Sequence, residues 1–230
     1  MTDLSRRERF VAGLGFSVDD FQLEAFAAVD AGENVLVSAP TGSGKTLVAT
    51  YAIERVLDNG GRAFYTTPLK ALSNQKFNEL VERYGAHKVG LLTGDNSVNP
   101  DADVVVMTTE VLRNMLLTES SQIQRLNVVI LDEVHYLQDP YRGGVWEEVI
   151  ILTPSIVQFV ALSATIANAR VVAEWLSEVR GPTTVVVEQT RPIALHNHVA
   201  IARRAQELPE LIDLLKGSAL SDEARRVDFI

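Results

Sequence analysis

The clearest pattern in the chain is a recurring apolar, often β-branched run that ends abruptly in small or polar residues. Five such runs are followed by polar segments: Val35–Val37 by Ser38–Thr41, Ala63–Tyr65 by Thr66–Pro68, Val104–Met107 by Thr108–Glu110, Val128–Leu131 by Asp132-Glu133, and Phe159–Leu162 by Ser163–Thr165. Continuous apolar runs of this length are typical of strands that are buried on both faces, as in a parallel sheet. We therefore expect five buried strands that each lead into polar residues.

Helical spacing of apolar residues occupies the intervals between these runs. It predicts helices over residues 45–57, 69–81 and 111–117, and Gly60-Gly61 ends the first of them. Alternating strands and helices predict an α/β fold with a doubly wound, mainly parallel sheet, right-handed crossovers and helices on both faces. Ligands bind beyond the carboxyl ends of the strands in such sheets, so the five polar segments are expected to gather along one edge.

The pattern thins after Pro182. Residues 185–187 could form one more strand, and four later residues fit one face of a short helix: Leu208, Leu211, Ile212 and Leu215. Residues 217–230 are polar and give no clear signal. We expect one domain over residues 1–200 and a linker or truncated tail over residues 201–230.

Composition and charge narrow the class of protein. The 230 residues are 47% hydrophobic and 22% charged, which is enough to bury a full core. The net charge of −9 argues against holding nucleic acid by bulk positive charge, but it does not exclude a local groove. With no cysteine, disulfides, thiolate zinc sites and cysteine nucleophiles are excluded. The N-terminus lacks a signal-peptide core and no apolar run approaches the roughly 20 residues that span a bilayer, so we expect a cytoplasmic protein without a membrane partner.

Candidate phosphate chemistry lies between the first predicted strand and its helix. The segment is Ala39, Pro40, Thr41, Gly42, Ser43, Gly44, Lys45 and Thr46, which is the context of a phosphate-binding loop. The two glycines let backbone N–H groups turn toward phosphate oxygens, and the start of the helix adds its dipole. Lys45 offers a compact cation, and the Thr46 hydroxyl can join the coordination of Mg²⁺. Ala39 departs from the general pattern, which has glycine there; the alternative is a glycine-rich turn.

An acidic pair, Asp132-Glu133, ends the most apolar strand. An aspartate at this place would reach Mg²⁺, usually through water, and Glu133 could orient and deprotonate the attacking water. The alternative is an acidic N-cap on the following helix. Other nucleotide-binding classes fit less well, because the chain has neither an Asn-Lys-x-Asp guanine-reading motif nor a Leu-Ser-Gly-Gly-Gln transporter signature.

With Asp132-Glu133-Val134-His135 in place, the chain resembles a superfamily 2 helicase of the DExH type, whose first domain is a RecA-like P-loop NTPase fold. Further segments agree: Thr67–Lys76 resembles motif Ia, Thr93–Asp95 and Thr108–Asn114 resemble the next two strand-binding segments, Ser163–Thr165 resembles motif III, and Phe21-Gln22 resembles the adenine-reading element. Tyr141–Glu148 and Arg191–Leu195 look most like the exosome-associated, superkiller-like RNA helicases and their actinobacterial relatives. The resemblance covers roughly residues 10–200.

The resemblance implies a role for each matching residue. The catalytic residues would be Lys45, Asp132, Glu133 and His135. ATP would be bound by Gln22 and residues 39–46, and Mg²⁺ by Thr46 and Asp132. Nucleic acid would be contacted by Pro68, Lys70, Thr93, Gly94, Thr109 and Arg113, and hydrolysis would be coupled to strand movement by Ser163 and Thr165. Gln22 would select adenine, and His135 would connect the nucleotide site to the domain interface. Small hydroxylated residues and helix N-termini can bind phosphates without a large positive net charge. A nucleic-acid partner is therefore compatible with the net charge of −9 on this chain.

Several of these residues have a structural alternative. Gln22 could be a surface residue, His135 could satisfy a buried backbone carbonyl, and Ser163 and Thr165 could be turn residues that end a strand. Thr108 or Thr109 could cap the helix that begins near Glu110.

The family core consists of two RecA-like domains with ATP in the cleft between them, and the second domain supplies arginine fingers. No stretch after Arg191 resembles that domain, so we expect the first domain alone, from a fragment, a truncated protein or a split gene. We expect it to bind ATP, Mg²⁺ and single-stranded or tailed duplex RNA, with DNA as an alternative. Its hydrolysis of ATP should be slow without a second RecA-like domain in cis or trans. The competing hypothesis is a non-catalytic ATP-binding module that scaffolds a partner.

Overall fold

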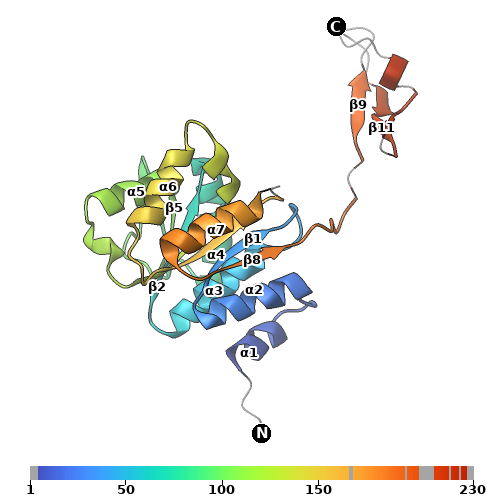
Figure 1. The fold of residues 1–230 in the computed structure, drawn as a ribbon. Coiled ribbons are helices and arrows are strands. Elements are labelled where there is room, and N and C mark those ends of the chain that lie inside the picture. Colours follow the sequence, from blue (N-terminus) through green and yellow to red (C-terminus); the bar gives the residue numbers. More distant parts are fainter. Residues whose placement is uncertain are drawn as a thin grey trace. The chain divides into compact units, whose positions relative to one another are not determined.

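The centre of the fold is a sheet of eight strands in the order β4-β3-β5-β2-β6-β7-β1-β8. Helices lie on both sides of this sheet (Figure 1). The strands are β1 (Asn34–Ser38), β2 (Arg62–Thr67), β3 (Val89–Thr93), β4 (Asn96–Val98), β5 (Val104–Thr108), β6 (Leu126–Leu131), β7 (Gln158–Ser163) and β8 (Thr183–Val187). Neighbouring strands pair in parallel, except that β3 and β4 form an antiparallel pair. This computed structural model confirms the mainly parallel α/β sheet.

The structure describes residues 5–165, 168–194, 196–201, 210–217, 219–222 and 224–226. The chain divides into two units, residues 1–190 and residues 191–230. The five predicted strands and the sixth near residues 185–187 all lie in the first unit. The expected extent of the nucleotide-binding domain, residues 1–200, stays a prediction.

Helices cover both faces of the sheet. Their bounds are α1 (Arg6–Ala12), α2 (Asp20–Ala31), α3 (Thr46–Asp58), α4 (Lys70–Tyr84), α5 (Thr109–Leu117), α6 (Gly143–Leu152) and α7 (Ala169–Arg180). The core on one face contains residues of α1 to α4, and the core on the other contains residues of α5 to α7. The helices predicted over residues 45–57, 69–81 and 111–117 correspond to α3, α4 and α5.

Side chains that alternate along each strand supply these two cores. Val35 and Val37 of β1 enter the core with α1 to α4, whereas Leu36 between them enters the core with α5 to α7. Tyr65 and Phe64 of β2 divide in the same way. A strand that must be apolar on both faces reads as a continuous apolar run, which explains why these strands could be found from the sequence.

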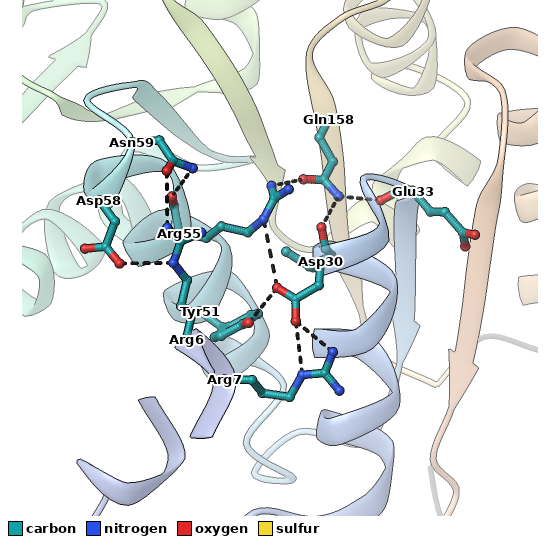
Figure 2. A network of polar contacts seen from close by, with 10 residues as sticks. Arg6, Arg7, Asp30, Glu33, Tyr51, Arg55, Asp58, Asn59 and Gln158 are labelled. Atoms are coloured by element: carbon teal, nitrogen blue, oxygen red, sulfur yellow. Dashed lines mark hydrogen bonds and ion pairs between the residues drawn. The ribbon is translucent and has the colours of Figure 1, made fainter. Parts of the chain in front are cut away.

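Helix α1 is joined to α2 and α3 by a polar network at the edge where the strands begin (Figure 2). Arg7 donates from Nε and one terminal nitrogen to Asp30 Oδ2, at 3.0 and 2.7 Å. The buried hydroxyl of Tyr51 donates to Asp30 Oδ1 at 2.6 Å. Phe10 lies with its ring centroid 5.0 Å from that of Tyr51. The network therefore fixes the edge of the sheet where the strands begin, opposite the edge where the polar strand ends lie.

The second unit contains short antiparallel pairs. Strand β9 (His198–Ile201) pairs with β10 (Glu210–Asp213), and β11 (Leu215–Lys216) pairs with β12 (Ala219–Leu220); a 3₁₀ turn spans Ala224–Arg226. The predicted short helix is therefore wrong for Leu211, Ile212 and Leu215, and Leu208 lies outside the described residues. A short apolar run fits either period, and pairing with β9 decides for the strand. Among the described residues, no helix has the length and apolar character needed to cross a membrane.

Candidate nucleotide-binding site

The polar ends of the central strands meet at one edge of the sheet. The Ala39 amide after β1 donates to the carbonyl of Ser163 in β7 at 3.2 Å. The Asp132 amide after β6 donates to the carbonyl of Thr66 in β2 at 3.0 Å. Parallel strands end on the same side, so segments 66 and 124 residues apart in sequence become hydrogen-bonded neighbours.

The loop between β1 and α3 is bent at its two inner glycines. Gly42 has φ +87° and Gly44 has φ +83°, a conformation that glycine adopts without steric cost. The hydroxyl of Ser43 is buried and has no hydrogen-bond partner among the described residues. Lys45 is 8% exposed, and within the described residues no hydrogen bond or ion pair is present at its ammonium. An ammonium that is not paired with a carboxylate favours an anionic ligand at this place.

A cavity of about 520 Å³ opens beside the loop. Seven of the predicted site residues line it: Thr41, Gly42, Gly44, Lys45, Thr46, Asp132 and Glu133. The loop cation and the acidic pair therefore face the same space. Ala39, Pro40 and Ser43 are buried in the loop, and Gln22 and His135 are also outside the lining of this cavity.

The Asp132 carboxylate has a donor on each oxygen. Tyr65 donates from its hydroxyl to Oδ2 at 2.7 Å, and the Glu133 amide donates to Oδ1 at 3.0 Å. Glu133 itself has φ +57°, in the left-handed region, and such backbone strain is concentrated at functional sites. It precedes a 3₁₀ helix, Val134–Gln138, but its side chain makes no capping bond. The N-cap alternative for this glutamate therefore has no support in the contacts.

His135 lies beside the acidic pair. Its Nδ1 is 3.2 Å from Glu133 Oε2, within ion-pair distance but not aligned for a hydrogen bond. The imidazole is partly exposed and its ring centroid is 5.0 Å from that of Tyr136. This contact places His135 next to the proposed base, and the coupling role remains a prediction.

Oxygen donors around the cavity suit Mg²⁺. Asp132 offers a carboxylate and Thr46 a hydroxyl, which are hard ligands, and both line the cavity. Within the part of the chain that the structure describes, no group of three or more His, Cys, Asp or Glu residues could hold a metal by itself. Mg²⁺ is commonly held by one or two carboxylates together with substrate phosphates, so this sparse donor set fits that ion.

One wall of the cavity consists of residues outside the predicted nucleotide site. Four of them are on α4: Leu72, Gln75, Lys76 and Glu79. Lys76 Nζ lies 2.5 Å from Glu79 Oε2, and Gln75 Nε2 donates to Glu79 Oε1 at 2.9 Å. Burial alone raises the pKa of Glu79, but these two donors outweigh it and the net shift of this pKa is downward. The spacing 72, 75, 76, 79 shows that these residues share one helix face, but not that this face lines the cavity.

Gln22 is buried beneath the loop. Its Oε1 accepts the Asp19 amide at 3.0 Å, and its Nε2 donates to the Gly44 carbonyl at 3.0 Å. The alternative of a surface residue is therefore wrong, since the side chain is 4% exposed. The structure joins Gln22 to the phosphate loop; its contact with adenine remains a prediction.

Two of the segments predicted to contact nucleic acid are joined to each other. Lys70, at the start of α4, forms an ion pair with Asp95, and Thr93 Oγ1 donates to Asp95 Oδ1 at 3.2 Å. Gly94 between them is exposed, whereas Pro68 is buried and its carbonyl accepts a hydrogen bond from Arg142 at 3.0 Å. The Lys70 cation is therefore already paired in the free protein.

The third segment lies at α5. Thr109 is 1% exposed, and its hydroxyl donates to the Thr67 carbonyl at 3.3 Å, which ties α5 to the end of β2. Arg113, one turn later, forms an ion pair with Glu148 of α6. The cation of this segment is also paired, while the hydroxyl of Thr109 is committed to the protein.

The predicted coupling residues lie at the end of β7. Ser163 is fully buried, and its hydroxyl has no hydrogen-bond partner in the part of the chain that the structure describes. Thr165 is exposed, and the Ala164 carbonyl between them accepts from Ser38 Oγ at 3.4 Å. These contacts place the segment directly beside the strand that leads into the phosphate loop.

Comparisons with known proteins agree with this arrangement. The family model described as DEAD/DEAH box helicase matches residues 19–175, and the chain belongs to that family. The "Probable helicase HelY" of Mycobacterium leprae is 55% identical over 208 residues, which are 90% of this chain and 23% of that protein. The mouse "Exosome RNA helicase MTR4" is 48% identical over 185 residues, 80% of this chain and 18% of that protein. The predicted resemblance to exosome-type DExH helicases is thus confirmed.

Solved structures share the fold. The helicase Lhr of Mycobacterium smegmatis, solved with single-stranded DNA and AMP-PNP, superposes with a TM-score of 0.64 at 33% identity, over 80% of this chain and 27% of that one. The DNA-bound helicase MrfA gives a TM-score of 0.65 at 24% identity, over 80% of this chain and 30% of that one. The chain therefore has the RecA-like fold of helicases, and it spans about a quarter of the length of the HelY relative.

Proposed function

We propose that this chain is the ATP-binding domain of an ATP-dependent DExH-box RNA helicase, and that it binds Mg²⁺–ATP in the cavity beside the phosphate loop. One observation carries the proposal. Among the described residues the Lys45 ammonium has no ion-pair partner, and Lys45 lines the same cavity as Asp132 and Glu133. A cation and two carboxylates around one space match a polyphosphate accompanied by a divalent metal ion.

Each residue would have a distinct task. The backbone of the Gly42–Gly44 turn and the Lys45 ammonium would bind the phosphates, and Thr46 and Asp132 would hold Mg²⁺. When bound, Mg²⁺ would neutralise charge on the outer phosphates. Glu133 would orient the attacking water and accept its proton, and His135, 3.2 Å from Glu133, would link this group to an adjoining domain.

We further propose that the nucleic acid is single-stranded or tailed duplex RNA. The supporting observation is the similarity at 48% identity to a protein described as an exosome RNA helicase, although Lhr was solved with single-stranded DNA. Lys70, Thr93, Gly94 and Arg113 would contact the phosphate backbone, while the buried Pro68 and Thr109 would shape the surface. A second RecA-like domain and a cytoplasmic site of action, where ATP and RNA occur together, complete the proposal.

Nucleotide binding by the 230-residue chain tests the first part. Lys45→Ala should abolish measurable Mg²⁺–ATP binding, because it removes a charge-assisted contact to the outer phosphates. Lys88→Ala removes the same charge from an exposed position after α4 and should bind as the parent does. Binding by Lys45→Ala equal to that of the parent would contradict the assignment of the loop.

Hydrolysis tests the acidic pair. Glu133→Gln should keep nucleotide binding and lower residual hydrolysis, because the amide keeps the shape but cannot accept the proton. ATPase activity is measured with and without RNA. A non-catalytic ATP-binding scaffold would bind nucleotide, but neither RNA nor Glu133→Gln would change its background rate of ATP hydrolysis.

A further inference from the structure

Tyr65 reaches the acidic pair from inside the core. It lies in β2, where its Cα pairs with that of Ile130 in β6, two residues before Asp132. The side chain is 1% exposed, and the hydroxyl donates to Asp132 Oδ2 at 2.7 Å. The ring belongs to the core, but the hydroxyl ends at the carboxylate that lines the nucleotide cavity.

The bond from Tyr65 completes the fixation of Asp132. The Glu133 amide already holds Oδ1 at 3.0 Å, so the two donors together set the rotation of the carboxylate. Each carboxylate oxygen has two lone pairs, and one donor on each leaves capacity for a further ligand. The carboxylate is thus oriented without being saturated.

Lys76 holds the tyrosine ring from the cavity side. Its Nζ lies 5.5 Å from the centroid of the Tyr65 ring and 2.5 Å from Glu79 Oε2. A phenol hydroxyl can donate one hydrogen bond, and this one is used on the Asp132 carboxylate.

We propose that Tyr65 is a positioning residue, whose hydroxyl holds the Asp132 carboxylate in the orientation with which it binds the Mg²⁺ of Mg²⁺–ATP. The proposal rests on the proposed function of the cavity. Groups that orient a metal-binding side chain commonly contribute roughly 10- to 100-fold to metal affinity. Tyr65 differs from the family-derived assignments because it stands on a neighbouring strand, outside every motif that the resemblance identified.

The chain offers a matched control in Tyr51. This tyrosine is also buried, and its hydroxyl donates to an aspartate, Asp30 Oδ1, at 2.6 Å (Figure 2). Neither Tyr51 nor Asp30 lines the nucleotide cavity. Tyr51→Phe therefore removes the same type of buried bond without touching the Asp132 carboxylate.

The experiment measures binding of a fluorescent ATP analogue to the 230-residue chain in EDTA and across a Mg²⁺ titration. Tyr65→Phe should bind the nucleotide in EDTA as the parent does, but require about tenfold more Mg²⁺ for half of the Mg²⁺-dependent gain. Tyr51→Phe should have the Mg²⁺ requirement of the parent. In an Asp132→Asn background, Tyr65→Phe should change nothing further, because the carboxylate that it positions is gone.

Three outcomes would overturn the proposal, and they are distinguishable. An equal Mg²⁺ requirement in Tyr65→Phe and the parent makes Tyr65 a core residue only. A Tyr65→Phe chain that does not fold at any temperature, while Tyr51→Phe folds, makes the hydroxyl a folding requirement. A parent chain without Mg²⁺-dependent nucleotide binding refutes the proposed function itself, and the role of Tyr65 with it.

Discussion

Gln22 shows how a single side chain joins a helix start to the phosphate loop. One end of its amide accepts from the Asp19 backbone and the other donates to the Gly44 carbonyl. A Cβ added at Gly44 would lie 2.7 Å from Gln22 Nε2, so the glycine and the amide fit against each other. The amide retains one further N–H, so loop support and adenine contact are compatible.

Exchanges at Gln22 should separate these two tasks. We expect Gln22→Ala to weaken ATP binding more than GTP binding, because the amide matches the hydrogen-bonding edge of adenine. Gln22→Glu keeps the acceptor for Asp19 but loses the donor to Gly44, and it serves as the control for loop support. Competition binding measures both nucleotides. If Gln22→Ala weakened ATP and GTP binding equally, Gln22 would support the phosphate loop without contacting adenine.

Tyr51 predicts an alkaline loss of stability. Burial, and then Asp30, raise its pKa to about 12, from an ordinary value of about 10. The folded chain thus keeps this proton where the unfolded chain has lost it. The contribution to stability is complete below pH 10 and disappears as the pH rises to 12.

Denaturant unfolding at pH 9 to 12 measures this contribution. The free energy of unfolding of the parent should fall across this range, and that of Tyr51→Phe should fall less steeply. Tyr65 and Tyr84 also have raised pKa values and are present in both chains, so the difference between the two slopes belongs to Tyr51. Identical slopes would show that Tyr51 ionises in the folded chain as it does in the unfolded one.

At the scale of elements, the sequence predicts what depends on burial and local geometry. The six strands could be located because their residues are apolar on both faces. The loop before α3 could be located because its turn requires positive φ angles at Gly42 and Gly44, which glycine adopts without steric cost. The cavity wall on α4 could not, because only tertiary packing decides that Lys76 lies over Tyr65. The pairing of Ile212 with Val199 is equally non-local, and it overrides the helical spacing of that segment.

Two ion pairs between elements should weaken nucleic-acid binding. Lys70 of α4 is paired with Asp95 between β3 and β4, and Arg113 of α5 with Glu148 of α6. A phosphate would have to compete with each carboxylate. Asp95→Asn and Glu148→Gln should therefore each raise the affinity for single-stranded RNA about two- to fivefold at low salt, with less gain at high salt.

A charge-matched exchange provides the control for this prediction. Asp58→Asn breaks the pair with Arg6 at the other edge of the sheet, where Nε lies 3.2 Å from Oδ2 (Figure 2). It changes the net charge by the same amount and should leave RNA affinity unchanged. Fluorescence anisotropy over a salt series measures all three variants. If Asp58→Asn raised the affinity for RNA as much as the other two exchanges do, the gain would be explained by net charge and not by the two ion pairs.

At the scale of the molecule, the order of the strands assembles the site. Strands β2, β6, β7 and β1 are consecutive in the sheet, so the acidic pair, the predicted coupling segment and the phosphate loop follow one another along its edge. The same edge continues through β5 and β3 to the segments predicted to contact nucleic acid. Neighbouring strand ends thus provide a short physical connection between nucleotide chemistry and the proposed RNA surface.

Under the proposed function, the chain would supply one wall of a cleft between two RecA-like domains. Closure of a second domain over the cavity would expel water and bring in arginines, and both strengthen electrostatic stabilisation of the transferring phosphoryl group. An arginine supplied from another domain contributes about 10³–10⁵ in rate in other phosphoryl-transfer systems. We therefore predict that the 230-residue chain folds and binds ATP but does not unwind a duplex.

Appending a second RecA-like domain from an exosome-type relative should restore RNA-stimulated ATPase activity and unwinding. The assay compares both proteins on duplexes with a 5′ or a 3′ single-stranded tail, which covers both directions of unwinding. Glu133→Gln in the two-domain protein should bind the tailed duplex but not separate it, which ties unwinding to hydrolysis at this cavity. ATP-dependent strand separation by the 230-residue chain alone would contradict the prediction, because one wall of the cleft would then be sufficient for the motor.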